Sequence, residues 1–119
     1  MEQAELYAAE LDKGLVLQAL SRHLGKRNGS SASDLVKAIC GRTSAAKERR
    51  LRSLIQELRE EGHHVCAHPT HGYFIASTAE ELDETCEFLY SRAMCSLVQI
   101  SAMRRVSMPD LRGQLHLPT

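Results

Sequence analysis

Apolar residues recur at helical spacing in four stretches of the chain and alternate with more polar residues in two shorter ones. Leu51, Leu54, Ile55 and Leu58 are the clearest case, because the spacing i, i+3, i+4, i+7 places all four on one side of a helix. In chain order, the predicted elements are helices from Leu6 or Asp12 to Leu24, from Ser33 to Cys40 and from Ser44 to Gly62, strands at 65–67 and 73–75, and a last helix from Thr78 to about Arg105.

Residues typical of helix ends support these boundaries. Ser31 with Asp34, and Thr78 with Glu81, have the spacing of a capping box at the start of a helix. Gly41 is suited to end the second helix, and the sequence PTHG supplies turn residues between the two strands. We therefore expect four helices and one hairpin. Residues 1–76 would form one domain, and residues 77–119 a helix and tail within the same compact unit.

The third predicted helix has two unlike faces. At 100° per residue, the side opposite its apolar stripe is centred on Arg49, Ser53 and Gln56, with Arg50 and Arg52 on the flanks. If the stripe faces the core, these arginines face solvent.

Positive charge is concentrated in one part of the chain, although the net charge is zero. Residues 22–59 contain ten Lys and Arg against three acids, whereas residues 60–89 contain seven acids and no Lys or Arg. This segregation favours a polyanionic partner on the positive side. The alternative is a solvated face whose arginines pair with nearby glutamates. In the third helix the cations lie toward the N-terminus and the acids toward the C-terminus, the reverse of what the helix dipole prefers, and this order favours an external anion.

The order of helix, helix, basic helix, hairpin and long helix resembles the winged helix-turn-helix family of DNA-binding proteins. The motifs that carry the resemblance are LVKAI, LRSLIQELREEGH and GYFIA, within residues 13–76. The resemblance implies a mainly helical α+β fold, with a three-helix core, a two-stranded wing and a long C-terminal helix. From Ile39 to Leu51 the chain is longer than the family's tight turn, so we expect a longer loop or an extra helical turn there.

In that family the third helix enters the major groove and the wing lies along the DNA backbone. The resemblance implies that Arg49, Ser53 and Gln56 read base edges, while the flanking cations contact phosphates. The predicted DNA-binding residues are Arg42, Ser44, Lys47, Arg49, Arg50, Arg52, Ser53 and Gln56, with His68, Thr70 and His71 in the wing.

The hairpin also holds the densest group of metal-capable side chains: His63, His64, Cys66, His68 and His71. Three of them are conceivable as zinc ligands. No second pair such as CxxC accompanies them, so polar wing residues are the favoured interpretation, and no metal or cofactor is expected.

The last helix carries a nearly heptad seam, and its far end extends beyond what a three-helix body can cover. We expect a homodimer through this helix, with the capping of the chain's own core as the alternative. The predicted dimer interface comprises Leu89, Ala93, Leu97 and Ile100.

The C-terminal sequence resembles the short Gln-Leu-x-Leu-aromatic peptides that dock on the bacterial sliding clamp. Gln114, Leu115 and Leu117 match, whereas Pro118 stands where the aromatic residue would be. A plain helix end that packs Leu115 onto the body is the alternative interpretation.

These observations favour sequence-specific binding of double-stranded DNA by a small dimeric protein. It would be a transcriptional regulator or a replication accessory of a phage or mobile element. The alternative is a protein–protein adaptor that uses the seam of the last helix, with the arginines as a solubilising surface. No P-loop, Gly-x-Ser-x-Gly or carboxylate pair indicates an enzyme. No apolar run or N-terminal pattern indicates a membrane span or a secretion signal, so a cytoplasmic protein is expected.

Overall fold

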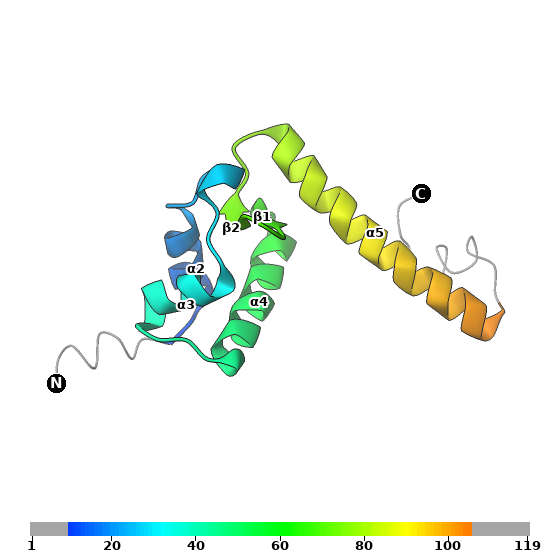
Figure 1. Ribbon diagram of the computed structural model, residues 1–119, viewed down its shortest axis with the longest axis horizontal. Coiled ribbons are helices and arrows are strands. Elements are labelled where there is room, and N and C mark those ends of the chain that lie inside the picture. Colours follow the sequence, from blue (N-terminus) through cyan, green and yellow to red (C-terminus); the bar gives the residue numbers. More distant parts are fainter. Residues whose placement is uncertain (1–9, 106–119) are drawn as a thin grey trace. The chain divides into compact units, whose positions relative to one another are not determined.

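The computed structural model describes residues 10–105, which form helices and a two-stranded antiparallel hairpin (Figure 1). This confirms the predicted mainly helical α+β arrangement. The elements are α2 (Lys13–Leu20), the short 3-10 helix η1 (Lys26–Asn28), α3 (Ala32–Cys40), α4 (Ala45–Glu60), β1 (Val65–His68), β2 (Gly72–Ile75) and α5 (Ala79–Arg104). The chain divides into two compact units, the first ending at Thr85 and the second beginning at Cys86.

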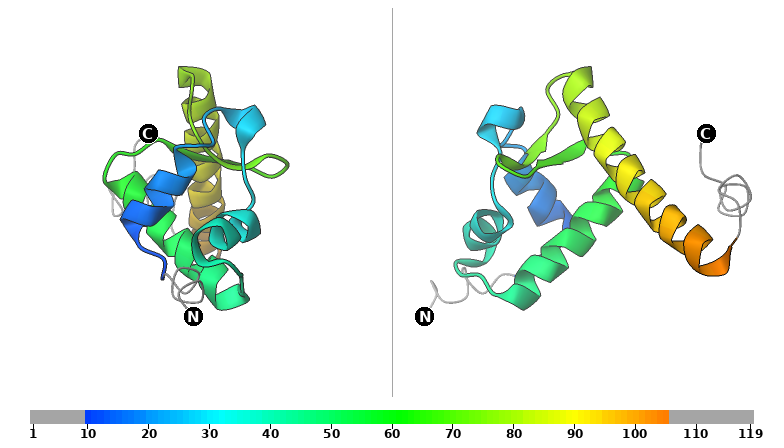
Figure 2. Two further views of the ribbon diagram at one scale, coloured as in Figure 1. Left: turned by 90° about the vertical axis from the view of Figure 1, so that its left-hand side faces the viewer. Right: turned by 45° about the vertical axis from the view of Figure 1, so that its right-hand side comes forward.

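Helices α2, α3 and α4 pack against one another and form the core of the first unit (Figure 2). All four residues of the predicted apolar stripe of α4 are buried: Leu51, Leu54, Ile55 and Leu58 are each at most 2% exposed. They meet Val16 and Leu20 of α2 and the aliphatic residues of α3 in one aliphatic cluster. Burial of this stripe fixes which face of α4 is left for solvent.

Side-chain caps start the helices where the sequence predicts. The Ser31 hydroxyl accepts a hydrogen bond from the Asp34 backbone N–H at 3.0 Å, and the Ser44 hydroxyl accepts one from Lys47 at 3.2 Å. Gly41 ends α3 with a left-handed φ of 84°. The stretch between Ile39 and Leu51 therefore contains a loop from Gly41 to Ser44, followed by the first turns of α4.

The first helix ends at Leu20, four residues before the predicted end. The backbone beyond it is used for pairing with β2. The His23 carbonyl accepts from the Ile75 N–H, and the Gly25 N–H donates to the Ile75 carbonyl, both at 2.8 Å. A segment that pairs with a strand cannot continue the helical ladder, and helical periodicity alone does not reveal this competition.

The hairpin is joined to the α2–α3 connector along the outer side of β2. Its register pairs Val65 with Ile75 and His68 with Gly72. On the outer side of β2, Ser30 and Tyr73 exchange two backbone hydrogen bonds, of 2.8 and 2.7 Å. The connector between α2 and α3 thus serves as a third extended segment beside the hairpin, where the sequence indicated only a polar connector.

The first turns of α5 are anchored to the same unit. The Glu81 N–H donates to the Thr78 hydroxyl at 3.1 Å, as the capping box predicts. The Glu81 carboxylate accepts from the backbone N–H groups of Ser77 at 2.8 Å and of Lys26 at 3.0 Å. The buried Thr85 hydroxyl accepts from the Ala67 N–H at 3.3 Å. Glu81 therefore ties η1 and the end of the hairpin to the start of α5.

These backbone hydrogen bonds hold the pKa of Glu81 below its usual value, since they favour the charged carboxylate. The stabilisation is present above the unfolded pKa of about 4.3 and is lost as the pH falls through the lowered folded pKa. We expect Glu81→Gln to lower the melting temperature at pH 7 and to flatten its dependence on pH between about 5 and 3. Thermal unfolding followed by circular dichroism would measure this. The exposed neighbour Glu80, changed to Gln, is the control, and a curve for Glu81→Gln parallel to that of the unchanged chain would contradict the assignment.

Within residues 10–105, no helix has the length and apolarity needed to cross a bilayer. The predicted helix start at Leu6 and the clamp-like residues Gln114, Leu115 and Leu117 lie outside the described residues.

Candidate nucleic-acid interface

The polar side of α4 is open to solvent. Arg49, Arg50, Arg52, Ser53 and Gln56 are all exposed, on the face opposite the buried leucines. Their exposure confirms the orientation predicted from helical periodicity. The face presents three guanidinium groups, a hydroxyl and an amide, which are donors suited to phosphate oxygens and to base edges.

The carboxylates near this face contact groups other than its arginines. Glu48 accepts from the Thr43 hydroxyl at 2.9 Å, and Glu60 accepts from the Gln56 amide at 3.2 Å. Glu57 and Glu61 contact the ammonium group of Lys13 in α2. Among residues 10–105, no ion pair joins a carboxylate to any cation of the α4 face. The alternative of a face neutralised by its own glutamates is therefore not the arrangement found.

Lys13 explains in part why the glutamates at the end of α4 do not pair with the arginines of its exposed face. Its hydrogen bond to Glu61, together with the charges of Glu61 and Glu57, raises the pKa of the Lys13 ammonium above its usual value. A cation from another helix thus offsets part of the negative charge at the C-terminal end of α4. The cationic N-terminal part has no equivalent acidic partner in the part of the chain that the structure describes.

The start of α4 determines where the predicted cations lie. Arg42 is exposed in the loop after Gly41, whereas Lys47 is half-buried in the first turn of the helix. Ser44 is the N-cap, and its hydroxyl oxygen already accepts from Lys47. Ser44 therefore fixes the point at which the helix begins, a role that the DNA-contact prediction did not include.

Arg59 was not among the predicted site residues, and it links α4 to the hairpin. Its Nε donates to the Val65 carbonyl at 2.8 Å, and the side chain is half-buried. The contact holds the first residue of β1 against the end of α4. No spacing rule in the sequence reveals a side chain-to-backbone bond of this kind.

The turn of the hairpin is organised by a histidine. The Nδ1 atom of His68 accepts from the backbone N–H groups of Thr70 at 3.1 Å and of His71 at 3.3 Å. The rings of His68 and His71 lie 4.9 Å apart, centroid to centroid. Thr70 is exposed and His71 is half-buried. Of the three predicted wing residues, His68 therefore shapes the turn, and Thr70 offers the more accessible side chain.

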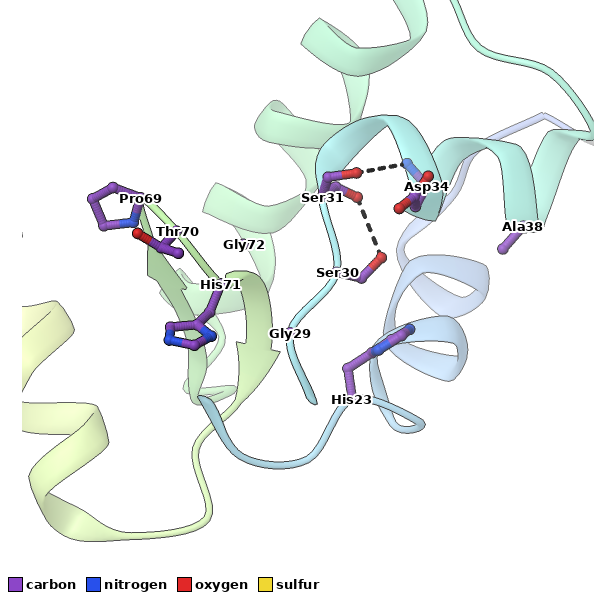
Figure 3. Close-up of a pocket in the computed structure, with 10 residues that line it drawn as sticks. All are labelled: His23, Gly29, Ser30, Ser31, Asp34, Ala38, Pro69, Thr70, His71 and Gly72. Carbon is purple, nitrogen blue, oxygen red and sulfur yellow. Dashed lines mark hydrogen bonds between the residues drawn. The ribbon is translucent and has the colours of Figure 1, made fainter. Parts of the chain in front are cut away.

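A polar pocket lies between this turn and the start of α3 (Figure 3). It has a volume of about 560 Å³, and Figure 3 shows His23 and His71 on opposite sides of the extended segment at Gly29. The lining residues are His23, Gly29, Ser30, Ser31, Asp34, Ala38, Pro69, Thr70, His71 and Gly72. Sequence reasoning did not find this pocket, because it brings together two parts of the chain, residues 23–38 and 69–72, that are far apart in the sequence.

The hairpin histidines do not assemble a metal centre with the neighbouring thiol. Within the described residues, no group of three or more His, Cys, Asp or Glu side chains is arranged to hold a metal ion. Cys66 is buried, and its Sγ lies 3.6 Å from the Glu81 carbonyl.

The predicted dimer residues on α5 differ in exposure. Leu89 is 42% exposed, Ala93 and Ile100 are half-buried, and Leu97 is only 1% exposed. Other apolar side chains on this helix are more exposed, notably Phe88 and Val98. The guanidinium of Arg92 lies 5.8 Å from the centroid of the Phe88 ring.

Comparison of the chain with protein-family models, with curated proteins and with solved structures finds no match.

Proposed function

We propose that the chain is a winged helix-turn-helix protein that binds double-stranded DNA through α4. The order of helices and strands supports this, and so does the pairing of the α2–α3 connector with β2, which extends the hairpin by a third segment. The observation that carries the proposal is the exposed arginine face of α4, which lacks acidic partners among the described residues.

In the proposed mechanism the N-terminal half of α4 enters the major groove. Arg49, Ser53 and Gln56 contact base edges, while Arg50 and Arg52 contact phosphates. Arg42 and Lys47, at the start of the helix, add further positive charge toward the backbone. The buried leucine stripe holds the helix against the core, so the guanidinium groups are presented without a conformational change.

The hairpin acts as the wing. Its turn, with Thr70 exposed and His68 holding the backbone, contacts the DNA backbone beside the groove. Arg59 maintains the position of β1 relative to α4, so that the helix and the wing bind as one surface.

The proposed biological role is control of transcription or of replication in the cytoplasm, for a phage or another mobile element. Dimerisation through α5 would provide two copies of α4 for one DNA site.

The salt dependence of binding tests the proposal. A surface that neutralises several phosphates should lose on the order of 10³-fold in affinity for duplex DNA between about 50 and 200 mM salt. Fluorescence anisotropy with a labelled duplex drawn from the DNA around the protein's own gene measures this. Feeble binding at every salt concentration would contradict the proposal.

The exposed apolar side chains of α5 favour a second candidate, a protein–protein adaptor. Phe88 is 50% exposed and Val98 is 55% exposed, and exposed apolar side chains that gather on one helix favour contact with another protein. An adaptor would bind its protein partner with little salt dependence and would bind DNA weakly. The same titration therefore distinguishes the two candidates.

A further inference from the structure

From Phe88 onward, α5 carries a stripe of exposed small and apolar side chains. We call it the exposed stripe, and it consists of Phe88, Ser91, Cys95, Val98 and Ala102. The positions alternate between spacings of three and four residues, which places all five side chains on one side of the helix in the manner of a heptad repeat. Their exposure leaves this side available for a partner helix.

The seam predicted from sequence offers less surface. Leu97 is only 1% exposed, so its side chain has almost no area to contribute to an interface. Ala93 and Ile100 are half-buried. A helix partner would therefore gain more from the exposed stripe than from the seam.

We propose that the exposed stripe is the dimer contact and that it pairs the α5 helices of two copies of this chain in antiparallel orientation. This proposal builds on the dimer suggested above, and it holds or fails independently of DNA binding. A two-fold axis between the helices makes the contact self-complementary, as a closed homodimer requires.

The charge order along α5 selects the antiparallel orientation. Glu80, Glu84 and Glu87 are exposed where the stripe begins, and Arg105, three residues after Ala102, is exposed where it ends. Parallel pairing would bring like-charged ends together. Antiparallel pairing places the acids of one helix near Arg105 of the other, which lowers the electrostatic energy and specifies the orientation.

The side chains of the exposed stripe also complement one another in this orientation. With the axis between Ser91 and Cys95, Phe88 of one copy faces Val98 of the second copy, and Ser91 faces Cys95. The large side chains then lie on either side of a centre made of small ones. Small residues at the crossing point allow two helices to approach closely.

Substitution of Phe88 and Val98, the two large side chains of the exposed stripe, tests whether the stripe is the dimer contact. Phe88→Ser with Val98→Ser should weaken self-association at least tenfold in sedimentation velocity. Leu89→Ser with Met103→Ser is the matched control, because both residues are exposed and lie outside the stripe. Circular dichroism verifies that each variant is folded. Equal dimerisation of both double variants would overturn the proposal.

Engineered thiols test the orientation. Cys86→Ser removes the other exposed thiol, and adding Ser91→Cys then provides a thiol that should face Cys95 of the second copy. Oxidation with diamide should give a disulfide-linked dimer on a non-reducing gel. Addition of Cys95→Ser to the same chain should abolish it, whereas efficient crosslinking without Cys95 would indicate parallel helices and overturn the proposal.

A monomer at every concentration would also overturn it, and would assign the exposed stripe to another occupant, such as residues 106–119 or a different protein. Duplex binding is measured separately by anisotropy. A chain that binds DNA without dimerising would disprove the dimer contact alone, and one that dimerises without binding DNA would disprove the proposed function alone.

Discussion

Replacement of Arg49 and Arg50 together with alanine is expected to lower the affinity for duplex DNA about 100-fold. Both side chains are exposed on α4, and no acidic group in residues 10–105 pairs with them. Each arginine is expected to contribute about 1.5 kcal/mol through charge-assisted hydrogen bonds to DNA, and about 3 kcal/mol corresponds to a 100-fold change. Fluorescence anisotropy at a fixed salt concentration measures the loss.

The salt dependence of the double variant should change as well. Each lost phosphate contact lowers the slope of log affinity against log salt by about one. Because these arginines have no ion pair to lose within the described chain, the free energy of unfolding should change by less than about 0.5 kcal/mol for each substitution. A large fall in the melting temperature would show instead that the guanidinium groups stabilise the fold.

The matched control replaces Arg22 and Arg104 with alanine. Both are exposed and lie outside α4, and the change in net charge is the same. The control should weaken DNA binding only a few-fold, through the general electrostatic attraction. If it weakens binding as much as the α4 variant does, the contact is not specific to α4.

The α4 face could be predicted from sequence because it depends on local geometry. Once Leu51, Leu54, Ile55 and Leu58 are assigned to the core, the helical repeat places Arg49 and Ser53 on the opposite side. The capping residues Ser31 and Thr78 identified helix starts for the same reason, since a cap hydrogen bond spans only three residues. Local patterns were sufficient for these features.

The contacts that join distant segments could not be predicted. The pairing of Ser30 with Tyr73 and the bond from Arg59 to the Val65 carbonyl depend on how elements meet after folding. The exposure of α5 is a similar case, because the heptad pattern suggested a seam through Leu97, and that residue is buried. Periodicity identifies an apolar side of a helix, but it does not encode which apolar side remains exposed.

Gly72 lies where two distant segments meet, because it packs against the Ser30 backbone. The substitution Gly72→Ala is expected to lower the free energy of unfolding by about 3–5 kcal/mol. Gly72 has a φ of 80°, a conformation that costs a residue with a Cβ about 1–2 kcal/mol. An added Cβ would lie 2.4 Å from the Ser30 carbonyl oxygen, so the connector would have to move away from β2. Movement breaks the two Ser30–Tyr73 hydrogen bonds, each worth about 1 kcal/mol. A loss of this size is a large part of the stability of a small domain.

Gly62→Ala separates the two causes. Gly62 also has a positive φ, of 97°, but an added Cβ would meet nothing within 4 Å. This variant should lose only the conformational cost of about 1–2 kcal/mol. Chemical denaturation followed by circular dichroism gives both free energies of unfolding. Equal losses in the two variants would mean that the connector is not held tightly against β2, and the hairpin could then not keep the fixed position beside α4 that the proposed wing requires.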